Sequence, residues 1–311
     1  MKSNYVFPKE LLNDSIETRI NYFEKLWIEH PALDEAFEHA MSAIIGHATP
    51  KVILVAGSTG VGKTTLGLHL YRRVRALYAA QMEAELDFVP VMYGNAIAPN
   101  GSSFSWKDFY IRLLGRALEP LIDRKILVPR QLSFLPDDRS SSLHDKSTSD
   151  ALRRSVEECM RRRRTKVLII DEAHHILMVN NQKRLEFQFE ALKSLAIETN
   201  AVIVLIGTYR LLDICAQSGQ LVRRSELVHF PRYDYRVKQD RESFQSVLQT
   251  FLRYLPLPTP PSLEVYAEQF YIYSGGCVGI LKEWLARASC PPPRNAQQGS
   301  QLELRIVIFL E

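Results

Sequence analysis

The segment from Gly57 to Thr64 constrains the fold of this chain more than any other. It reads Gly-Ser-Thr-Gly-Val-Gly-Lys-Thr and matches the pattern GxxxxGK[ST] at every position. An apolar run, residues 51–56, precedes it, and a helical pattern follows from Lys63 to about Glu85. A strand, a glycine-rich turn and a helix in this order form a P-loop, so the chain is predicted to bind a nucleoside triphosphate.

Each part of this loop has an expected role at the phosphates. Its glycines let backbone N–H groups face the phosphates, and Lys63 adds a point charge near the β- and γ-phosphates. The Thr64 hydroxyl can ligate Mg²⁺, so ATP and Mg²⁺ are the expected cofactors. The predicted nucleotide-binding residues are Gly57, Ser58, Thr59, Gly60, Val61, Gly62, Lys63, Thr64, Thr65 and Asp171.

A second apolar run ends in an acidic pair. Residues 167–170 read as a buried strand, and Asp171 and Glu172 follow directly. Asp171 is expected to hold the magnesium ion together with Thr64, and Glu172 stands where a base can orient the attacking water. Such pairs are common after strands and carry weight here because a P-loop accompanies them. The pair therefore predicts hydrolysis of ATP as well as binding.

Two further features are candidate catalytic groups, each with a plainer alternative. Thr208 ends the apolar run 202–206 and is predicted to contact the γ-phosphate if that strand neighbours the P-loop strand. The alternative is an ordinary end of a strand. Arg223 and Arg224 precede a weaker strand at 227–230 and can act as an arginine finger across a subunit interface. Their alternative is a solvated pair at a helix end.

The order of the patterns predicts an α/β fold. Strands are expected at 51–56, 88–93, 167–170, 202–206 and 227–230, with helical patterns between them. Fully apolar strands alternating with helices indicate a parallel five-stranded sheet covered by helices, followed by a small all-helical lid. The predicted domains are an N-terminal helical extension (1–48), a nucleotide-binding domain (49–236), the lid (237–290), and a linker with a C-terminal tail (291–311). Residues 129–150 are expected to form a polar loop, and 302–310 an isolated apolar segment.

The composition is that of an ordinary globular protein. Of the 311 residues 46% are hydrophobic, and the net charge of +4 is too small to indicate a nucleic-acid partner by itself. The four cysteines form no CxxC pair, and no apolar run approaches a membrane span, so a cytoplasmic protein without membrane contact is expected. The basic run Arg161–Arg164 stands at a predicted helix end, which favours a solvated surface over a DNA contact.

Four segments together resemble one family of ATPases. The P-loop, the acidic pair, Thr208 and the arginine pair, followed by a helical lid, resemble the AAA+ ATPases. More narrowly, the chain is similar to the TniB/TnsC family of ATP-dependent transposition regulators, found in Tn7-like and CRISPR-associated transposons. The resemblance covers about residues 10–290, and its segments are LIIDEAHHI, VLIGTYRLLDI, GQLVRRSELVHF and SGGCVGILKEWLARA.

The resemblance implies an AAA+ P-loop fold and a bacterial protein that forms a ring or helical filament on duplex DNA. It further implies a transposase and a TniQ-like target selector as partners. Related ATPases place DNA contacts after the second strand, so Lys107 and Ser103 are candidate DNA-binding residues, with an ordinary surface loop as the alternative. Many AAA+ lids carry a phosphate-sensing arginine where this chain has Gly275–Lys282, and Lys282 is the candidate substitute.

Other readings of the same residues remain. The string Asp171-Glu-Ala-His174 beside a P-loop also suits a helicase or a loader, although the chain beyond residue 235 lacks the strand pattern of a second motor domain. A nucleotide-switched adaptor is a third reading, but it has no need of Glu172 as a base. His174 and His175 show no third ligand at metal spacing, which favours packing or a polar network over zinc.

Overall fold

The computed structural model describes residues 6–46, 52–99, 104–117, 137–177, 182–212, 225–257 and 263–289, with only the backbone given for 137–147 and 182–185. Contacts along the chain divide the described residues into two compact units. One unit contains 36–56 and 63–229, and the other contains 1–35, 57–62 and 230–311. The functional domain boundaries at 48, 236 and 290 stay a prediction.

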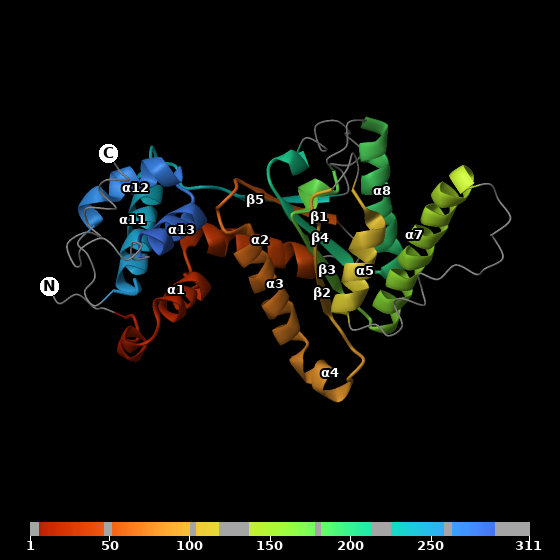
Figure 1. Cartoon of the computed structure of the whole chain (residues 1–311), viewed down its shortest axis with the longest axis horizontal. Helices are drawn as coiled ribbons and strands as arrows, with labels where there is room; N and C mark the ends of the chain where they lie inside the picture. The colour runs from red at the N-terminus through yellow and green to blue at the C-terminus, as the bar shows by residue number, and fades with distance from the viewer. Residues whose placement is uncertain are drawn as a thin grey trace. The chain divides into compact units, whose positions relative to one another are not determined.

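The described strands form one five-stranded sheet in the order β2-β3-β4-β1-β5 (Figure 1). The pairs β1/β4, β3/β4 and β2/β3 are parallel, with Ala56 opposite Gly207 and Asn95 opposite Asp171. Every residue of β1 and β3 is buried, as expected for strands covered on both faces. The predicted parallel five-stranded sheet is confirmed. The strands are β1 Val52–Gly57, β2 Val91–Asn95, β3 Val167–Asp171, β4 Val202–Gly207 and β5 Ser225–Phe230.

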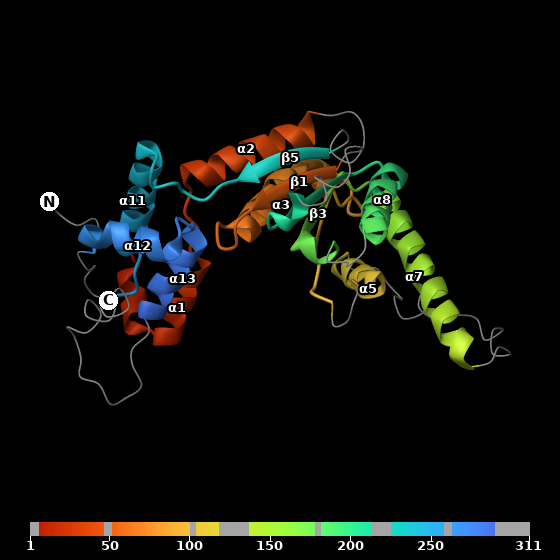
Figure 2. The ribbon, with the colours of Figure 1, turned by 90° about the horizontal axis from the view of Figure 1, so that it is seen from above.

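Helices cover the two faces of this sheet. Figures 1 and 2 show α3 (Lys63–Leu77) on one face and α5 (Trp106–Arg116), α7 (Asp137–Arg162) and α8 (Gln182–Thr199) on the other. Alternate strand residues such as Leu168 and Ile170 join the core beneath α5, α7 and α8. Strand residues of the opposite parity face α3, because side chains alternate along a strand. The short helix α4 (Ala79–Ala84) and the 3-10 turn η3 (Ala173–His175) complete these connections.

The second unit is helical around the P-loop residues that it contains. Helix α1 (Ile16–Lys25) and helix α13 (Val278–Ala288) lie against each other, and α11 (Lys238–Arg253) and α12 (Ala267–Ser274) both contact α13. The N–H groups of Val6 and Phe7 bond to the carbonyl of Arg253 at the end of α11. The N-terminal segment is therefore built into the same core as the C-terminal helices. The remaining elements are η1 (Lys9–Asn13), η4 (Glu264–Tyr266) and α2 (Pro31–Ile45), which continues from this unit into the other.

Most predicted elements lie where the sequence placed them, with two corrections. The strand expected at 88–93 begins only at Val91 and continues to Asn95. The polar loop expected at 129–150 is wrong for 137–150, where the backbone continues α7. Serine and aspartate residues there have weak helix propensity and no apolar period, so the sequence carries little sign of a helix. The expected apolar segment 302–310 and the rest of the tail lie outside the described residues. None of the described helices has the length and hydropathy of a membrane span.

Candidate nucleotide site

The P-loop turn leaves β1 with backbone angles that favour glycine. Gly60 and Gly62 have φ angles of 80° and 108°, in the region that side chains disfavour. A side chain at Gly60 would also meet Ile280 of α13, with its Cβ 2.4 Å from an Ile280 side-chain carbon. The two glycines thus permit both the shape of the loop and the close approach of a helix. This is the compact turn that the motif predicts.

The first residues of α3 carry the side chains that follow the turn. Lys63 is buried, with 7% of its surface exposed, and Thr64 is exposed at the start of the same helix. The first N–H groups of a helix have no partner within it, so this end favours anions. A buried cation, an exposed hydroxyl and a helix N-terminus in one short segment are suited to a phosphate chain.

Asp171 ends β3 at the carboxyl edge of the sheet and is 1% exposed. The Tyr93 hydroxyl donates to Asp171 Oδ2 at 2.9 Å, and the backbone N–H of Glu172 donates to Oδ1 at 2.9 Å. These bonds fix the orientation of the carboxylate, and each oxygen keeps a further lone pair. The Asp171 carboxylate is therefore a pre-oriented oxygen ligand for a cation.

Glu172 follows in a left-handed conformation, with φ 54° and ψ 29°. This conformation is uncommon for a residue with a side chain, and such departures concentrate at functional sites. Glu172 Oε2 lies 3.3 Å from His174 Nδ1. Burial, then the charges of His175, Lys63 and Arg210, lower the pKa of His174 from 6.5 to about 4. A neutral imidazole therefore lies beside the Glu172 carboxylate at neutral pH.

Thr208 follows β4, which lies between β3 and β1. The condition set by the sequence, that this strand neighbours the P-loop strand, is thus met. The Thr208 hydroxyl is buried and has no hydrogen-bond partner among the described residues. A buried hydroxyl without a partner costs free energy in the isolated chain. A bound ligand oxygen would remove that cost, which makes Thr208 a candidate contact for the terminal phosphate.

The two histidines after the acidic pair gather around Glu172. Ligand-type atoms of Glu172, His174 and His175 lie within 4.8 Å of one another, so Glu172 is the third group that the sequence spacing did not show. His175 Nδ1 is 2.8 Å from the carbonyl of Ala96 after β2, and the two imidazole rings lie 4.3 Å apart. These contacts support the predicted polar network, in which the histidines position the turn that carries Glu172.

Some predicted site residues either have contacts other than with the acidic pair and Thr208 or lie outside the described residues. Arg223, Arg224 and Ser103 lie outside the described residues. Lys107 is half-buried in the first turn of α5. Lys282, the candidate phosphate sensor, donates instead to the carbonyls of Glu24 and Leu26, at 2.6 and 2.7 Å. The structure thus gathers the acidic pair and Thr208 near the strand ends, and engages Lys282 elsewhere.

Sequence reasoning missed two contributors to this site. Tyr93 was read only as the end of a strand, although its hydroxyl holds Asp171. Its role follows from the pairing of β2 with β3, which places Tyr93 opposite Ile169 and which no short-range pattern contains. Gly279 was read as part of a lid motif, although its N–H donates to the Gly60 carbonyl at 2.6 Å. Only the tertiary structure brings these two glycines together.

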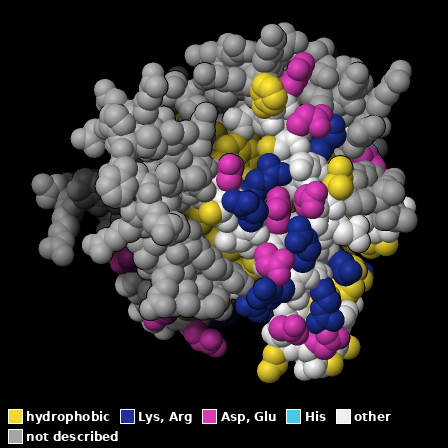
Figure 3. All heavy atoms as spheres, turned by 90° about the vertical axis from the view of Figure 1, so that its right-hand side faces the viewer, with side chains coloured by type: hydrophobic (Ala, Val, Ile, Leu, Met, Phe, Trp, Pro, Cys, Tyr) yellow, Lys and Arg dark blue, Asp and Glu magenta, His cyan; other side chains and the backbone are white. Residues whose placement is uncertain are grey.

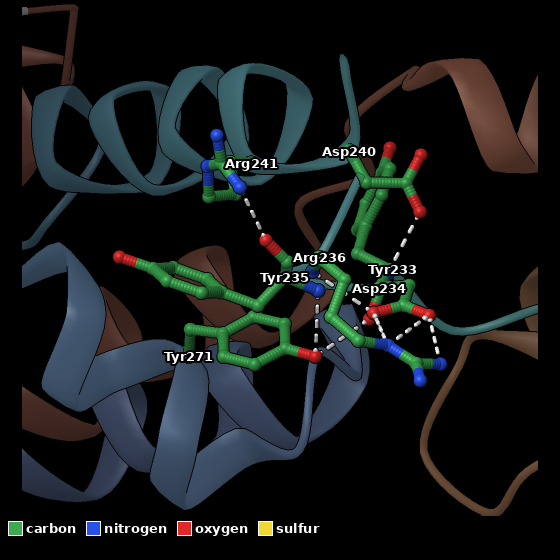
Figure 4. Close-up of polar contacts among 7 residues, drawn as sticks. All are labelled: Tyr233, Asp234, Tyr235, Arg236, Asp240, Arg241 and Tyr271. Atoms are coloured by element: carbon green, nitrogen blue, oxygen red, sulfur yellow. Dashed lines mark hydrogen bonds and ion pairs between the residues drawn. The ribbon is translucent and has the colours of Figure 1, made fainter. Parts of the chain in front are cut away.

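Several hydrogen bonds hold the connection from β5 to α11 (Figure 4). The Tyr271 hydroxyl donates to the carbonyl of Tyr233 and accepts from the N–H of Tyr235, both at 3.0 Å. Asp240 accepts from the N–H of Asp234 at 2.7 Å, and Arg241 donates to the carbonyl of Tyr235 at 2.7 Å. Residues 233–235 are therefore held against α11 and α12 of the same unit.

Comparison with known proteins identifies the family of this chain and solved structures with a similar fold. An AAA domain model matches residues 47–215, more than half of the chain. The ORC2 protein of Aeropyrum pernix, solved as ADPNP and ADP complexes, is similar with a TM-score of 0.52 and 16% identity. The alignment covers 87% of this chain and only 64% of the length of the ORC2 chain. At this identity the likeness shows a shared fold.

Two further solved structures are similar at lower TM-scores. A Walker-type ATPase of Pyrococcus abyssi has 16% identity and a TM-score of 0.49, covering 92% of this chain and 73% of its own. The replication initiator DnaA, bound to AMPPCP and single-stranded DNA, has 16% identity and a TM-score of 0.40, covering 85% and 66%. No curated protein matches the sequence. The family model covers more than half of the sequence, so the chain belongs to the AAA domain family.

Proposed function

We propose that this protein is an ATP-dependent regulator of transposition that assembles on duplex DNA and links target selection to transposase recruitment. The observation that carries the proposal is one set of segments, LIIDEAHHI, VLIGTYRLLDI and SGGCVGILKEWLARA, which resemble the TniB/TnsC family. The described parts of these segments include the acidic end of β3, the Thr208 end of β4 and the whole of α13, and α13 contacts the P-loop through Gly279.

The described residues fit ATP with Mg²⁺. Asp171 and Thr64 offer the oxygen ligands that Mg²⁺ prefers, and the ion, when bound, would neutralise charge on the phosphates. Lys63 and the loop N–H groups would bind the phosphates, Glu172 would orient the attacking water, and Thr208 would contact the γ-phosphate. In this proposal hydrolysis controls assembly and disassembly. Arg223 or Arg224 of a neighbouring copy would complete the site.

Helix α5 is the proposed DNA-facing element. Lys107 lies in its first turn, and Arg112 and Arg116 line a cavity of about 340 Å³ beside the end of β2. Arg112 pairs with Asp108, and Arg116 donates to the carbonyl of Tyr93, so both guanidinium groups are oriented. Cations held in this way can meet phosphate groups of a duplex. Lys107 and Ser103 remain the candidate DNA contacts.

Electron microscopy of the full chain with duplex DNA tests the proposal. With a slowly hydrolysed ATP analogue, ordered rings or helices coating the duplex are expected, and with ADP the DNA is expected to be bare. DNA that stays bare with the ATP analogue as well as with ADP would contradict the proposal. Movement along DNA coupled to ATP turnover, without stable assemblies, would instead indicate a helicase or loader.

A partner assay separates transposition from other DNA-dependent roles. A transposase and a TniQ-like protein encoded beside the gene are expected to bind the assembled form and not the ADP form. If the protein coats DNA but binds neither the transposase nor the TniQ-like protein, the transposition role is wrong. The protein is then a DNA-dependent ATPase with another role.

A further inference from the structure

The glycine-rich segment before α13 contacts the nucleotide loop through its backbone. The Gly279 N–H donates to the carbonyl of Gly60 at 2.6 Å, and both residues belong to the same compact unit. A Cβ at Gly279 would lie 2.6 Å from that carbonyl oxygen, closer than real Cβ atoms come. The Gly60 carbonyl therefore points at α13. The Gly60 carbonyl thus has a partner on α13 and does not point toward the phosphate side of the loop.

The same segment is also fixed to the chain that enters the lid. Gly276 has a φ of 75°, and a Cβ there would lie 2.3 Å from the carbonyl of Tyr233. The N–H of Tyr233 donates back to the Gly276 carbonyl at 3.1 Å. The turn before α13 is thus held on one side by this connection, drawn in Figure 4, and on the other by the P-loop.

Lys282, one turn further along α13, has a different partner. Its ammonium group donates to the carbonyls of Glu24 and Leu26 at the C-terminal end of α1, where carbonyls have no partner within the helix. A cation at this end of a helix is also favoured by the helix dipole. Burial lowers the pKa of the Lys282 ammonium group. Two short bonds to carbonyls leave this side chain committed to α1.

From these contacts we infer that α13 follows the state of the P-loop through the Gly60–Gly279 backbone bond, and that Lys282 is a clamp that makes α1 move with α13. Lys282 is then a positioning residue and no phosphate sensor. This coupling needs only nucleotide binding at the P-loop, and it holds whatever partner the protein serves. Through this coupling, the N-terminal helix α1 responds to which nucleotide is bound at the P-loop.

Hydrogen exchange of the full chain, with and without a slowly hydrolysed ATP analogue, tests the coupling. In the wild type, the analogue is expected to change amide exchange in the P-loop, in α13 and in α1 together. In Lys282→Met the changes in the P-loop and α13 remain and the change in α1 disappears, with ATP and ADP affinities within about twofold of wild type. Lys238→Met, an exposed lysine on α11, is the matched control and is expected to behave as wild type.

Two variants test the backbone contact. Gly279→Ala adds a Cβ against the Gly60 carbonyl and is expected to abolish the nucleotide-dependent change in both α13 and α1. Ile280→Ala removes the side chain beside Gly60 without adding bulk, and is expected to reduce both changes if Gly279→Ala fails to fold. Coupling that is unchanged in both variants would overturn the inference. So would a loss of about tenfold in ATP affinity, with ADP affinity kept, in Lys282→Met.

Discussion

Burial keeps two side chains of the site, Tyr93 and His174, in their neutral forms. Asp171 is held as an acceptor by the Tyr93 hydroxyl, and burial together with the Asp171 charge raises the pKa of Tyr93, so the tyrosine stays a donor. The pKa of His174 falls to about 4, so its imidazole is neutral beside Glu172. A site that must bind a polyanion thus keeps one buried cation, Lys63, and fixed donors around its carboxylates.

The Thr208 hydroxyl gives a prediction in which stability and activity change in opposite directions. Thr208→Val replaces a buried hydroxyl that has no partner among the described residues with a methyl group of similar shape. The nucleotide-free protein is expected to be as stable as wild type or up to about 1 kcal/mol more stable. ATP turnover is expected to fall by about tenfold or more, because the phosphate loses a donor. Thermal unfolding and steady-state turnover, measured on the same preparations, check both signs.

Unchanged turnover in that variant would mean that Thr208 is an ordinary strand end. Thr250→Val, on the exposed side of α11, is a control for the chemical change. Its hydroxyl donates to a carbonyl within the helix, so turnover is expected to stay at the wild-type level.

His30, directly before α2, predicts how stability depends on pH. It is 5% exposed and lies 3.0 Å from the Tyr233 hydroxyl, and burial lowers its pKa from 6.5 to about 4. The unfolded chain therefore binds the proton more tightly than the folded chain. The folded protein therefore has its full stability with respect to His30 above pH 6.5. As the pH falls toward 4, protonation of the unfolded chain lowers the free energy of unfolding by up to about 3 kcal/mol. His174 adds a loss in the same pH range.

Denaturant unfolding between pH 7 and pH 5 measures this dependence. His30→Phe keeps a ring against Phe230 and removes the titrating group, so its stability is expected to decline less steeply than that of wild type. His39→Phe on α2, whose side chain is half exposed, is the control and should keep the wild-type slope. Equal slopes in wild type and His30→Phe would refute the assignment.

At the scale of elements, helix α7 ends in a basic run that is already paired. Arg161 bonds Glu158 at 3.3 Å, Arg162 bonds Glu158 at 2.7 Å, and Arg164 pairs with Glu85 and Asp87. Figure 3 shows basic and acidic side chains intermixed over this side of the protein. A surface of alternating charge has no net attraction for a polyanion, which agrees with the solvated helix end expected from the sequence.

Replacing Arg161 and Arg162 by glutamine is therefore expected to leave duplex affinity within about twofold of wild type. The loss of stability is expected to stay below about 1 kcal/mol, because exposed ion pairs contribute little. Titration of binding against salt concentration gives the decisive comparison. A fall in the salt slope by about one per arginine removed would show that they contact phosphates. Lys107→Gln is expected to reduce that slope.

The elements that the sequence predicts are those with strong local patterns. The strand, turn and helix around Gly57–Thr64 follow from a motif and two apolar periods, and the fully apolar strands follow from their composition. The part of α7 before residue 148 has no apolar period, so the sequence does not predict it. The Tyr93–Asp171 bond and the Gly60–Gly279 contact depend on strand register and on packing between distant segments. Neither strand register nor packing between distant segments can be inferred from the local sequence pattern.

For the whole molecule, the described contacts connect the nucleotide loop to helices distant from it in sequence. Strand β1 leads into the P-loop, the P-loop contacts α13, and Lys282 of α13 bonds to the end of α1. The proposed control of assembly by ATP requires a connection of this kind between the phosphates and surface elements. Under the proposed function, assembly on DNA needs only bound ATP, whereas its reversal needs hydrolysis and therefore the Glu172 carboxylate.

Steady-state ATP turnover with and without duplex DNA, in wild type and in Glu172→Gln, tests this claim most directly. Wild-type turnover is expected to rise when duplex DNA is added, and turnover in the variant to fall by about 10² or more while ATP binding is kept. Glu264→Gln, an exposed residue in η4, is the matched control and should match wild type. Turnover that ignores DNA, or that survives in Glu172→Gln, would contradict the account.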